Sequence, residues 1–144
     1  MNMGNPTFKT IAYGSTEYEK ALILRCEILQ KSMDCQKEEE INLIHVAGFI
    51  EKDVCASAAL VPEVDALRMQ RVVVRKSLQR QGIGTSLLLH CESYAKNHSF
   101  NLIYCFSRIE VIPFYLKNGY IICGSITYKD NKPYQKMQKL IDVD

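Results

Sequence analysis

The sequence lacks the features that mark membrane and secreted proteins. None of its apolar runs approaches the roughly 20 residues that a transmembrane helix requires, and residues 1–6 contain no apolar signal core. Six cysteines are present without a single Cys-x-x-Cys pair, which argues against a zinc site or a disulfide framework. We therefore expect a cytoplasmic protein with reduced, mostly buried thiols, no bound metal and no membrane partner.

The sequence also has little net charge. Lys and Arg number 18 against 16 Asp and Glu, so the formal charge is only +2 and does not favour a nucleic-acid partner. Neither repeats nor low-complexity tracts interrupt the 144 residues. With 47% hydrophobic residues the chain is not disordered and is long enough to bury one core. We expect a single domain over residues 1–144.

Acidic residues are absent from one long window, residues 66–91, which contains five cations: Arg68, Arg71, Arg75, Lys76 and Arg80. In this window a β-branched run ends at Val74, a basic loop follows, and an apolar helical pattern begins at Ile83 beside Gly82 and Gly84. Glycines allow a ligand to approach the backbone, and a helix start presents unpaired N–H groups to an anion. The order predicts a strand, a phosphate-binding loop and a helix.

Two known phosphate loops do not fit this segment. A Walker loop requires Lys after its second glycine, and Gly84 is followed by Thr85. A dinucleotide fingerprint requires a third glycine where this chain has Leu87. The pattern that remains, Gln79-x-x-Gly82-x-Gly84, is also compatible with an ordinary strand-to-helix turn.

A second segment adds the necessary context. Residues 101–106 form an apolar strand pattern, and Phe114-Tyr115 is followed by Gly119-Tyr120, which indicates a short helix ended by glycine. With both segments in this order and at this separation, residues 67–120 resemble the GNAT superfamily of acetyl-CoA-dependent N-acetyltransferases. The resemblance implies direct transfer of an acetyl group from acetyl-CoA to a primary amine.

The expected fold is α/β (α+β), with helices on both faces of one sheet. The resemblance implies a single GNAT-like domain whose mixed, mostly antiparallel sheet is splayed between strands 4 and 5. Thr16 and Glu19 are expected to form the capping box of the first helix. Strands are expected over residues 8–13, 41–50, 54–61, 67–74, 101–106, 120–128 and 134–141, with a long helix over 83–97.

The resemblance also implies where acetyl-CoA binds. Backbone N–H groups between Gln81 and Thr85 would hold the diphosphate, while the strand around Val74 would pair with pantetheine. The Val74 N–H would polarise the thioester carbonyl. The cofactor-binding residues are expected to be Val72, Val73, Val74, Gln79, Arg80, Gln81, Gly82, Ile83, Gly84, Thr85 and Ser107. Arg75, Lys76 and Arg80 would screen the phosphates, or are ordinary surface cations.

Tyr115 occupies the position whose hydroxyl, by resemblance, gives a proton to the departing thiolate. Cys105 lies in an apolar strand, which indicates an inert buried thiol instead of a nucleophile. The base is left open: a water chain is one alternative, and the candidate side chains are Glu63, Asp65, Glu110 and His45.

The chain departs from the family pattern at two positions, where Arg108 replaces an Asn and Val111 replaces an Ala. Ser107 is expected to replace the Asn as a helix cap, and Pro113 to confine the regular helix to the residues that follow it.

The acceptor is expected to be a small molecule. The alternatives are a protein or peptide amine, which predicts an open groove near Tyr115, and a non-catalytic acyl-CoA-binding regulator. Specificity is expected to come from the first helix, residues 34–40 and the turn at 128–133. Asp34, Glu38, Glu39 and Glu40 would attract a cationic amine, or form a solvated acidic loop. An exposed final strand could pair two copies into a homodimer.

Overall fold

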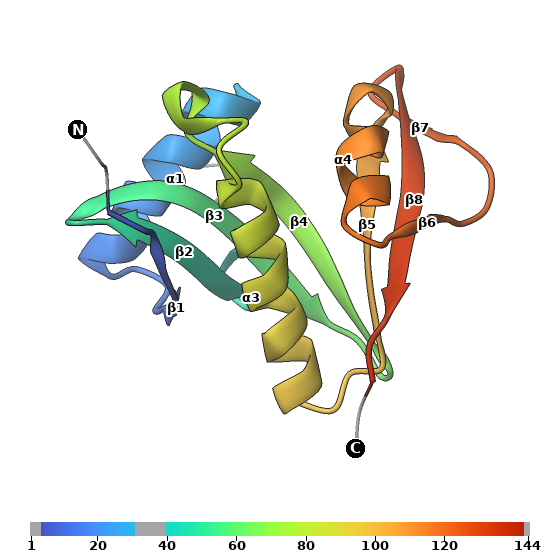
Figure 1. The fold of residues 1–144 in the computed structure, drawn as a ribbon, viewed down its shortest axis with the longest axis horizontal. Helices are drawn as coiled ribbons and strands as arrows, with labels where there is room; N and C mark the ends of the chain where they lie inside the picture. Colours follow the sequence, from blue (N-terminus) through green and yellow to red (C-terminus); the bar gives the residue numbers. More distant parts are fainter. Residues whose placement is uncertain (1–3, 31–39, 143–144) are drawn as a thin grey trace.

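The structure, a computed structural model, describes residues 4–30 and 40–142. Within these residues eight strands form one sheet in the order β1-β2-β3-β4-β5-β8-β6, with β7 paired to β8 (Figure 1). The strands are β1 (Thr7–Ile11), β2 (Ile44–Ile50), β3 (Asp53–Pro62), β4 (Ala66–Val74), β5 (Leu102–Arg108), β6 (Ile121–Ile122), β7 (Thr127–Lys129) and β8 (Lys132–Leu140). The α-helices are α1 (Thr16–Leu29), α3 (Ile83–Asn97) and α4 (Ile112–Lys117).

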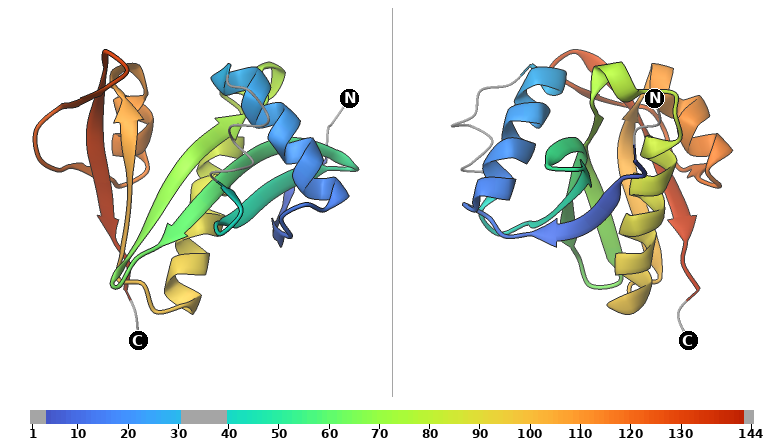
Figure 2. Two further views of the ribbon diagram at one scale, coloured as in Figure 1. Left: turned by 180° about the vertical axis from the view of Figure 1, so that it is seen from behind. Right: turned by 60° about the vertical axis from the view of Figure 1, so that its left-hand side comes forward.

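The helices lie on opposite faces of the sheet, which confirms the predicted fold class (Figure 2). On one face, α1 buries Tyr18 and Leu22 in a core that includes Val73 of β4. On the other face, Leu87 of α3 and Tyr115 of α4 belong to a second core. Each face therefore has its own apolar cluster, and the sheet separates them.

The sheet is splayed between β4 and β5, as predicted. These two strands are parallel but pair only from Ala66 to Arg68, opposite Leu102 to Tyr104. Figure 1 shows them diverging beyond this point, so that β5 to β8 and α4 stand apart from β1 to β4. The divergence opens toward the carboxyl ends of both strands, where Val74 and Arg108 lie.

A β-bulge in β4 changes which face its side chains contact. At Arg71, which has a φ of 54°, β3 advances by two residues where β4 advances by three. An inserted residue reverses the alternation of the strand. Met69 therefore packs in the α3 core before the bulge, whereas after it Val73 faces α1 and Val74 faces α3.

Glu40 belongs to a buried cluster of charged and polar side chains next to this bulge. Its Oε1 accepts hydrogen bonds from Arg25 Nη1 at 2.8 Å and from the Tyr18 hydroxyl at 2.7 Å, while its Oε2 lies 3.1 Å from Arg71 Nε. The carboxylate is fully buried. The expectation that Glu40 is solvated or attracts an amine is therefore wrong. Residues 34–39, which held the other acidic candidates, lie outside the described residues.

Two predicted local features differ from the structure. The N-cap of α1 is Ser15, whose Oγ accepts from the Tyr18 N–H at 3.1 Å, and not Thr16. The predicted strand over residues 120–128 is interrupted at Gly124, where a φ of 75° turns the chain between β6 and β7. The ends of the other predicted strands differ from the observed ones by at most three residues.

Pro113 lies in the first turn of α4, where its missing N–H removes no helical hydrogen bond. The regular helix begins at Ile112 and includes the proline, so the expectation that it is confined to the residues after Pro113 is wrong. Cys55, Cys91, Cys105 and Cys123 are free thiols. In the part of the chain that the structure describes, no helix combines the length and the apolar character needed to cross a membrane.

Candidate active site

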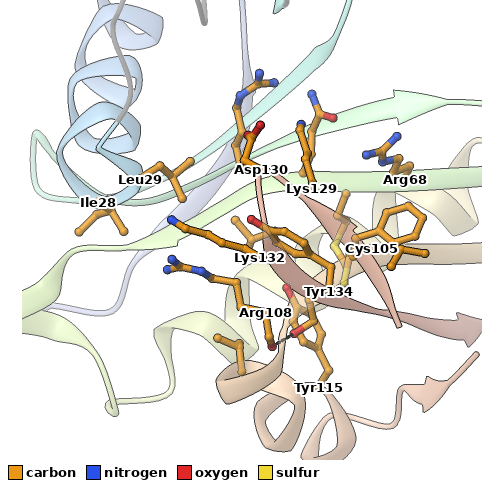
Figure 3. Close-up of a pocket in the computed structure, with 18 of the residues that line it drawn as sticks. Ile28, Leu29, Arg68, Cys105, Arg108, Tyr115, Lys129, Asp130, Lys132 and Tyr134 are labelled. Carbon is orange, nitrogen blue, oxygen red and sulfur yellow. Dashed lines mark hydrogen bonds between the residues drawn. The ribbon is translucent and has the colours of Figure 1, made fainter. Parts of the chain in front are cut away.

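A cavity of about 610 Å³ lies where β4 and β5 diverge (Figure 3). Successive residues of β5 point to opposite faces of the sheet, yet Cys105, Phe106, Ser107 and Arg108 all line the cavity. Cys105 belongs to the α3 core, so Phe106 and Arg108 point to the α1 face. The cavity therefore reaches both faces through the splay, and its volume is typical of small-molecule sites.

The edge of β4 that faces this cavity presents backbone groups to it. The N–H of Arg75 points away from the cavity and donates to the carbonyl oxygen of Cys55 in β3, at a distance of 2.8 Å. Because successive N–H groups of a strand point to alternate sides, the Val74 N–H points toward the splay. β5 pairs with β4 only as far as Arg68, so among the described strands none covers this N–H. Gln79 Nε2 donates to the Val74 carbonyl at 3.0 Å and fixes the loop to the strand end.

The first turn of α3 has the properties of an anion site. Its N-cap is Gly82, with a φ of 82° that L side chains rarely adopt, and no side chain caps the turn. No acidic residue lies in this turn, so neither a side-chain cap nor a nearby carboxylate offsets the unpaired N–H groups of Ile83, Gly84 and Thr85 at the positive end of the helix dipole. A Cβ built on Gly82 meets no atom within 4 Å. These features fit a bound diphosphate.

Gly84 differs from Gly82 in what it faces. A Cβ at Gly84 would lie 3.0 Å from the Phe114 ring. The missing side chain therefore lets α3 approach α4, the helix that carries Tyr115. Gly84 therefore packs against Phe114, the neighbour in sequence of the predicted proton donor Tyr115.

The basic residues of the loop separate into two kinds. Arg75 turns toward β3, where its Nε donates to the Val54 carbonyl at 3.2 Å. It therefore holds the end of β4 in place. Lys76, in the 3-10 helix Lys76–Leu78, and Arg80 are exposed near the start of α3.

Tyr115 lines the cavity from α4, with 5% of its surface exposed. Its hydroxyl lies beside the thiol of Cys105. Burial raises the pKa of Tyr115 well above its usual value near 10, and burial raises the pKa of Cys105 to about 12. Both groups are therefore protonated at neutral pH: the phenol is a potential proton donor, and the thiol is not a thiolate.

The expected role of Ser107 as a helix cap is wrong. Its Oγ donates to the Arg108 carbonyl at 2.8 Å, and the 3-10 helix Ile109–Val111 that follows has no side-chain cap. Ser107 is buried and lines the cavity.

None of the four base candidates is among the described residues that line the cavity. Glu63 follows β3 at the closed end of the splay and accepts a hydrogen bond from the Tyr104 hydroxyl at 2.7 Å. His45 is buried in β2, with Nδ1 3.1 Å from Arg25 Nη1, and burial lowers its pKa. Asp65 and Glu110 are exposed and are not among the described lining residues.

One carboxylate that was not among the base candidates, Asp130, lines the cavity from the β7–β8 turn. Among the described residues no group of three or more His, Cys, Asp or Glu side chains is placed to hold a metal ion.

For the part of the cavity expected to bind the acceptor, the sequence predicted segments of the chain but few individual side chains. Residues 28–30 at the end of α1 and residues in the 128–133 turn line it, so two of the three expected segments lie at the cavity, and their role in specificity stays a prediction. The side chains that dominate its charge, Arg108, Lys129 and Lys132, were not identified as site residues. The sequence of β8 does indicate that one face of this strand is polar, because every second residue is polar: Lys132, Tyr134, Lys136 and Gln138.

Residues 16–141 match the family described as Acetyltransferase (GNAT) domain. The chain belongs to this GNAT family. A curated relative, the tRNA(Met) cytidine acetyltransferase TmcA of Aeropyrum pernix, is 46% identical over 54 residues, a stretch that covers 37% of this chain and 8% of the relative. The chain thus spans only a small part of that curated protein.

Solved structures share the GNAT fold over nearly the whole chain. An aminoglycoside 6'-N-acetyltransferase complexed with coenzyme A has a TM-score of 0.83 at 18% identity, covering 96% of this chain and 98% of that one. An acyl-CoA N-acyltransferase from Pseudomonas aeruginosa has a TM-score of 0.78 at 16% identity, covering 94% and 99%. At these identities the likeness establishes the fold.

Proposed function

We propose that this GNAT chain is an acetyl-CoA-dependent N-acetyltransferase that moves the acetyl group directly to a primary amine of a small molecule. One observation carries the proposal. The cavity at the splay is lined both by β4, beyond the point where β5 pairs with it, and by Tyr115, while Gly84 in the uncapped first turn of α3 packs against Phe114 and Val74. When bound, acetyl-CoA supplies an acetyl group activated as a thioester.

The chain would hold this cosubstrate mainly through backbone groups. The N–H groups of Ile83, Gly84 and Thr85 would bind the diphosphate. The free edge of β4 pairs with the amides of pantetheine, as an added strand would. The Val74 N–H then donates to the thioester carbonyl oxygen, and because the strand holds it in place, its alignment requires no rearrangement during the reaction.

Tyr115 holds a proton at its hydroxyl oxygen, on the cavity wall, for the departing sulfur. Its raised pKa keeps that proton in place over the whole physiological range. The neutral Cys105 thiol is a poor nucleophile, which supports direct transfer over a covalent route through the protein.

The amine must lose a proton before it attacks. Asp130 is the one carboxylate among the described residues that line the cavity. We propose that it accepts this proton, directly or through a water molecule. Glu63, one of the candidates from the sequence, is hydrogen-bonded to Tyr104 at the closed end. The end of α1 and the β7–β8 turn bound the cavity, which supports a small acceptor over a peptide that needs an open groove.

The test is thiol release from acetyl-CoA with a panel of amino acids, polyamines, aminoglycosides and peptides, followed by mass analysis of the product. We expect release that depends on the acceptor and yields an N-acetylated amine. Tight binding of acetyl-CoA without release for any acceptor would contradict the proposal and favour a regulator.

A further inference from the structure

Three cations meet on the α1-facing side of the cavity. The register places Arg108 opposite Tyr134, Tyr134 opposite Thr127, and Lys129 opposite Lys132. Because residues two apart along a strand share a face, Arg108, Lys129 and Lys132 project from the same face of this part of the sheet. All three line the cavity, and Figure 3 shows the charged ends of Arg108 and Lys132 extended in the same direction. We call these three residues the cationic wall.

The two lysines of the cationic wall are direct cross-strand neighbours in a hairpin. Like charges in this position destabilise a hairpin, and no ion pair to either lysine is found within the described residues. Asp130, in the two-residue turn between them, is the one carboxylate of the described lining. The hairpin therefore carries uncompensated positive charge into the cavity.

The arginines differ in how far their charge is satisfied. Arg71 is paired with the buried Glu40. Arg108 has its Nε 3.6 Å from Glu110 Oε1, but these side chains are 53% and 69% exposed, so the pair is weak. Arg68 lies across the cavity over the Phe106 ring, 5.1 Å from its centroid, and its buried Nε has no hydrogen-bond partner. Donors on both sides of the cavity are therefore unused.

We propose that the acceptor amine carries an anionic group, a carboxylate or a phosphate, which binds the cationic wall. The inference rests on the proposed function and names its substrate class. An anion would receive charge-assisted hydrogen bonds from these side chains and relieve the repulsion between Lys129 and Lys132. A polyamine would add positive charge to a cavity that already has an excess of it.

The test uses primary amines of equal length that differ at the far end: β-alanine, 3-aminopropylphosphonate, propylamine and 1,3-diaminopropane. Their binding to the protein saturated with CoA is measured by calorimetry, and their turnover by thiol release from acetyl-CoA. We expect an anionic amine to bind at least about tenfold more tightly than propylamine, and the diamine to bind worst. The ratio of β-alanine to the phosphonate tells a carboxylate site from a phosphate site.

Variants assign the effect to the cationic wall. Lys132→Gln and Arg108→Gln should each weaken binding of the preferred anionic amine by roughly three- to tenfold and leave propylamine unchanged. Lys132→Glu should reverse the order in favour of the diamine. Lys96→Gln removes an exposed cation from the last turn of α3, outside the cavity, and should change nothing.

Equal binding of all four amines, binding of none, or tighter binding of the diamine to the unmodified protein would overturn the inference. So would an anion preference that survives Lys132→Glu. Thiol release with all amines and no charge preference contradicts this inference alone. Charge-selective binding without thiol release from any amine contradicts the proposed function alone.

Discussion

The two sides of the splayed sheet differ in the kind of polar group that they present. On the α3-facing side the polar groups are mostly backbone N–H groups, at the first turn of α3 and along the edge of β4, with Tyr115 as the main side chain. On the α1-facing side the polar groups are side chains carried by β5 and by the β7–β8 hairpin.

This difference indicates a division of labour. Backbone groups are the same for any sequence that keeps the conformation, which suits a ligand of fixed chemistry. Side chains on a hairpin can vary without altering the fold, which suits an individual acceptor. Changes on the α3-facing side should therefore affect every acceptor alike, and changes on the α1-facing side should alter the choice among acceptors.

The largest effect is expected where the α1-facing side meets the core. Glu40→Gln would leave Arg25 and Arg71 buried without their carboxylate, so the free energy of unfolding should fall by about 3–5 kcal/mol. Denaturant titration measures this. Glu17→Gln, which removes a solvent-exposed partner of Lys9, is the control and should cost about 1 kcal/mol or less. Equal losses in the two variants would show that the buried carboxylate contributes no more to the free energy of unfolding than the exposed one.

Tyr115→Phe tests the side chain of the α3-facing side. We expect kcat to fall about 100-fold for every acceptor, with the Kd of acetyl-CoA unchanged, because only the proton donor is removed. Tyr128→Phe, at an exposed position in β7, is the matched control. Full activity of Tyr115→Phe would exclude the proton-donor role.

The pH profile sharpens the same test. The pKa of Tyr115 is raised well above 10 because the phenol is buried, so it loses its proton only at higher pH than an exposed tyrosine. Ionisation of Tyr115 should therefore cause no loss of kcat between about pH 7 and pH 10. A loss in this range that disappears in the phenylalanine variant would contradict the assigned direction.

Gly82→Val tests the backbone cradle. Valine does not tolerate a φ of 82°, so the loop must change conformation and move its N–H groups. We expect acetyl-CoA to bind about tenfold more weakly, because the displaced N–H groups no longer contact its diphosphate. Gly14→Val introduces the same strain at a φ of 79°, also with no atom within 4 Å of the new Cβ, but away from the cavity. If both variants bind acetyl-CoA normally, the cradle lies elsewhere.

The smallest effect is expected at Cys105. Cys105→Ser should keep kcat within about threefold, because a neutral thiol that only contacts Tyr115 does not form a covalent intermediate. Steady-state kinetics with two acceptors provides the measurement. Abolished turnover in a folded variant would indicate a route through the cysteine.

The same division explains what could be predicted from the sequence. The start of α3 at Ile83 was predicted correctly, because a strand pattern, a basic loop with glycines and an apolar helical pattern follow one another in a short segment. That Gly82 is its N-cap was not predicted. The place of the splay followed from the resemblance.

Features that depend on contacts between distant segments were missed. Glu40 belongs to an acidic run in the sequence, and only the packing of α1 shows that Arg25 neutralises it. The bulge at Arg71 has no glycine to mark it. Lys129 and Lys132 were recognised as part of a turn, but their position beside Arg108 depends on the strand register.

The most direct test of the central claim is a crystal structure of the protein with CoA. We expect the diphosphate at the N–H groups of the first turn of α3 and the thiol end between Val74 and Tyr115, with Arg108, Lys129 and Lys132 uncovered. Phosphates of CoA seated on these three cations, or a cofactor outside the splay, would contradict the account.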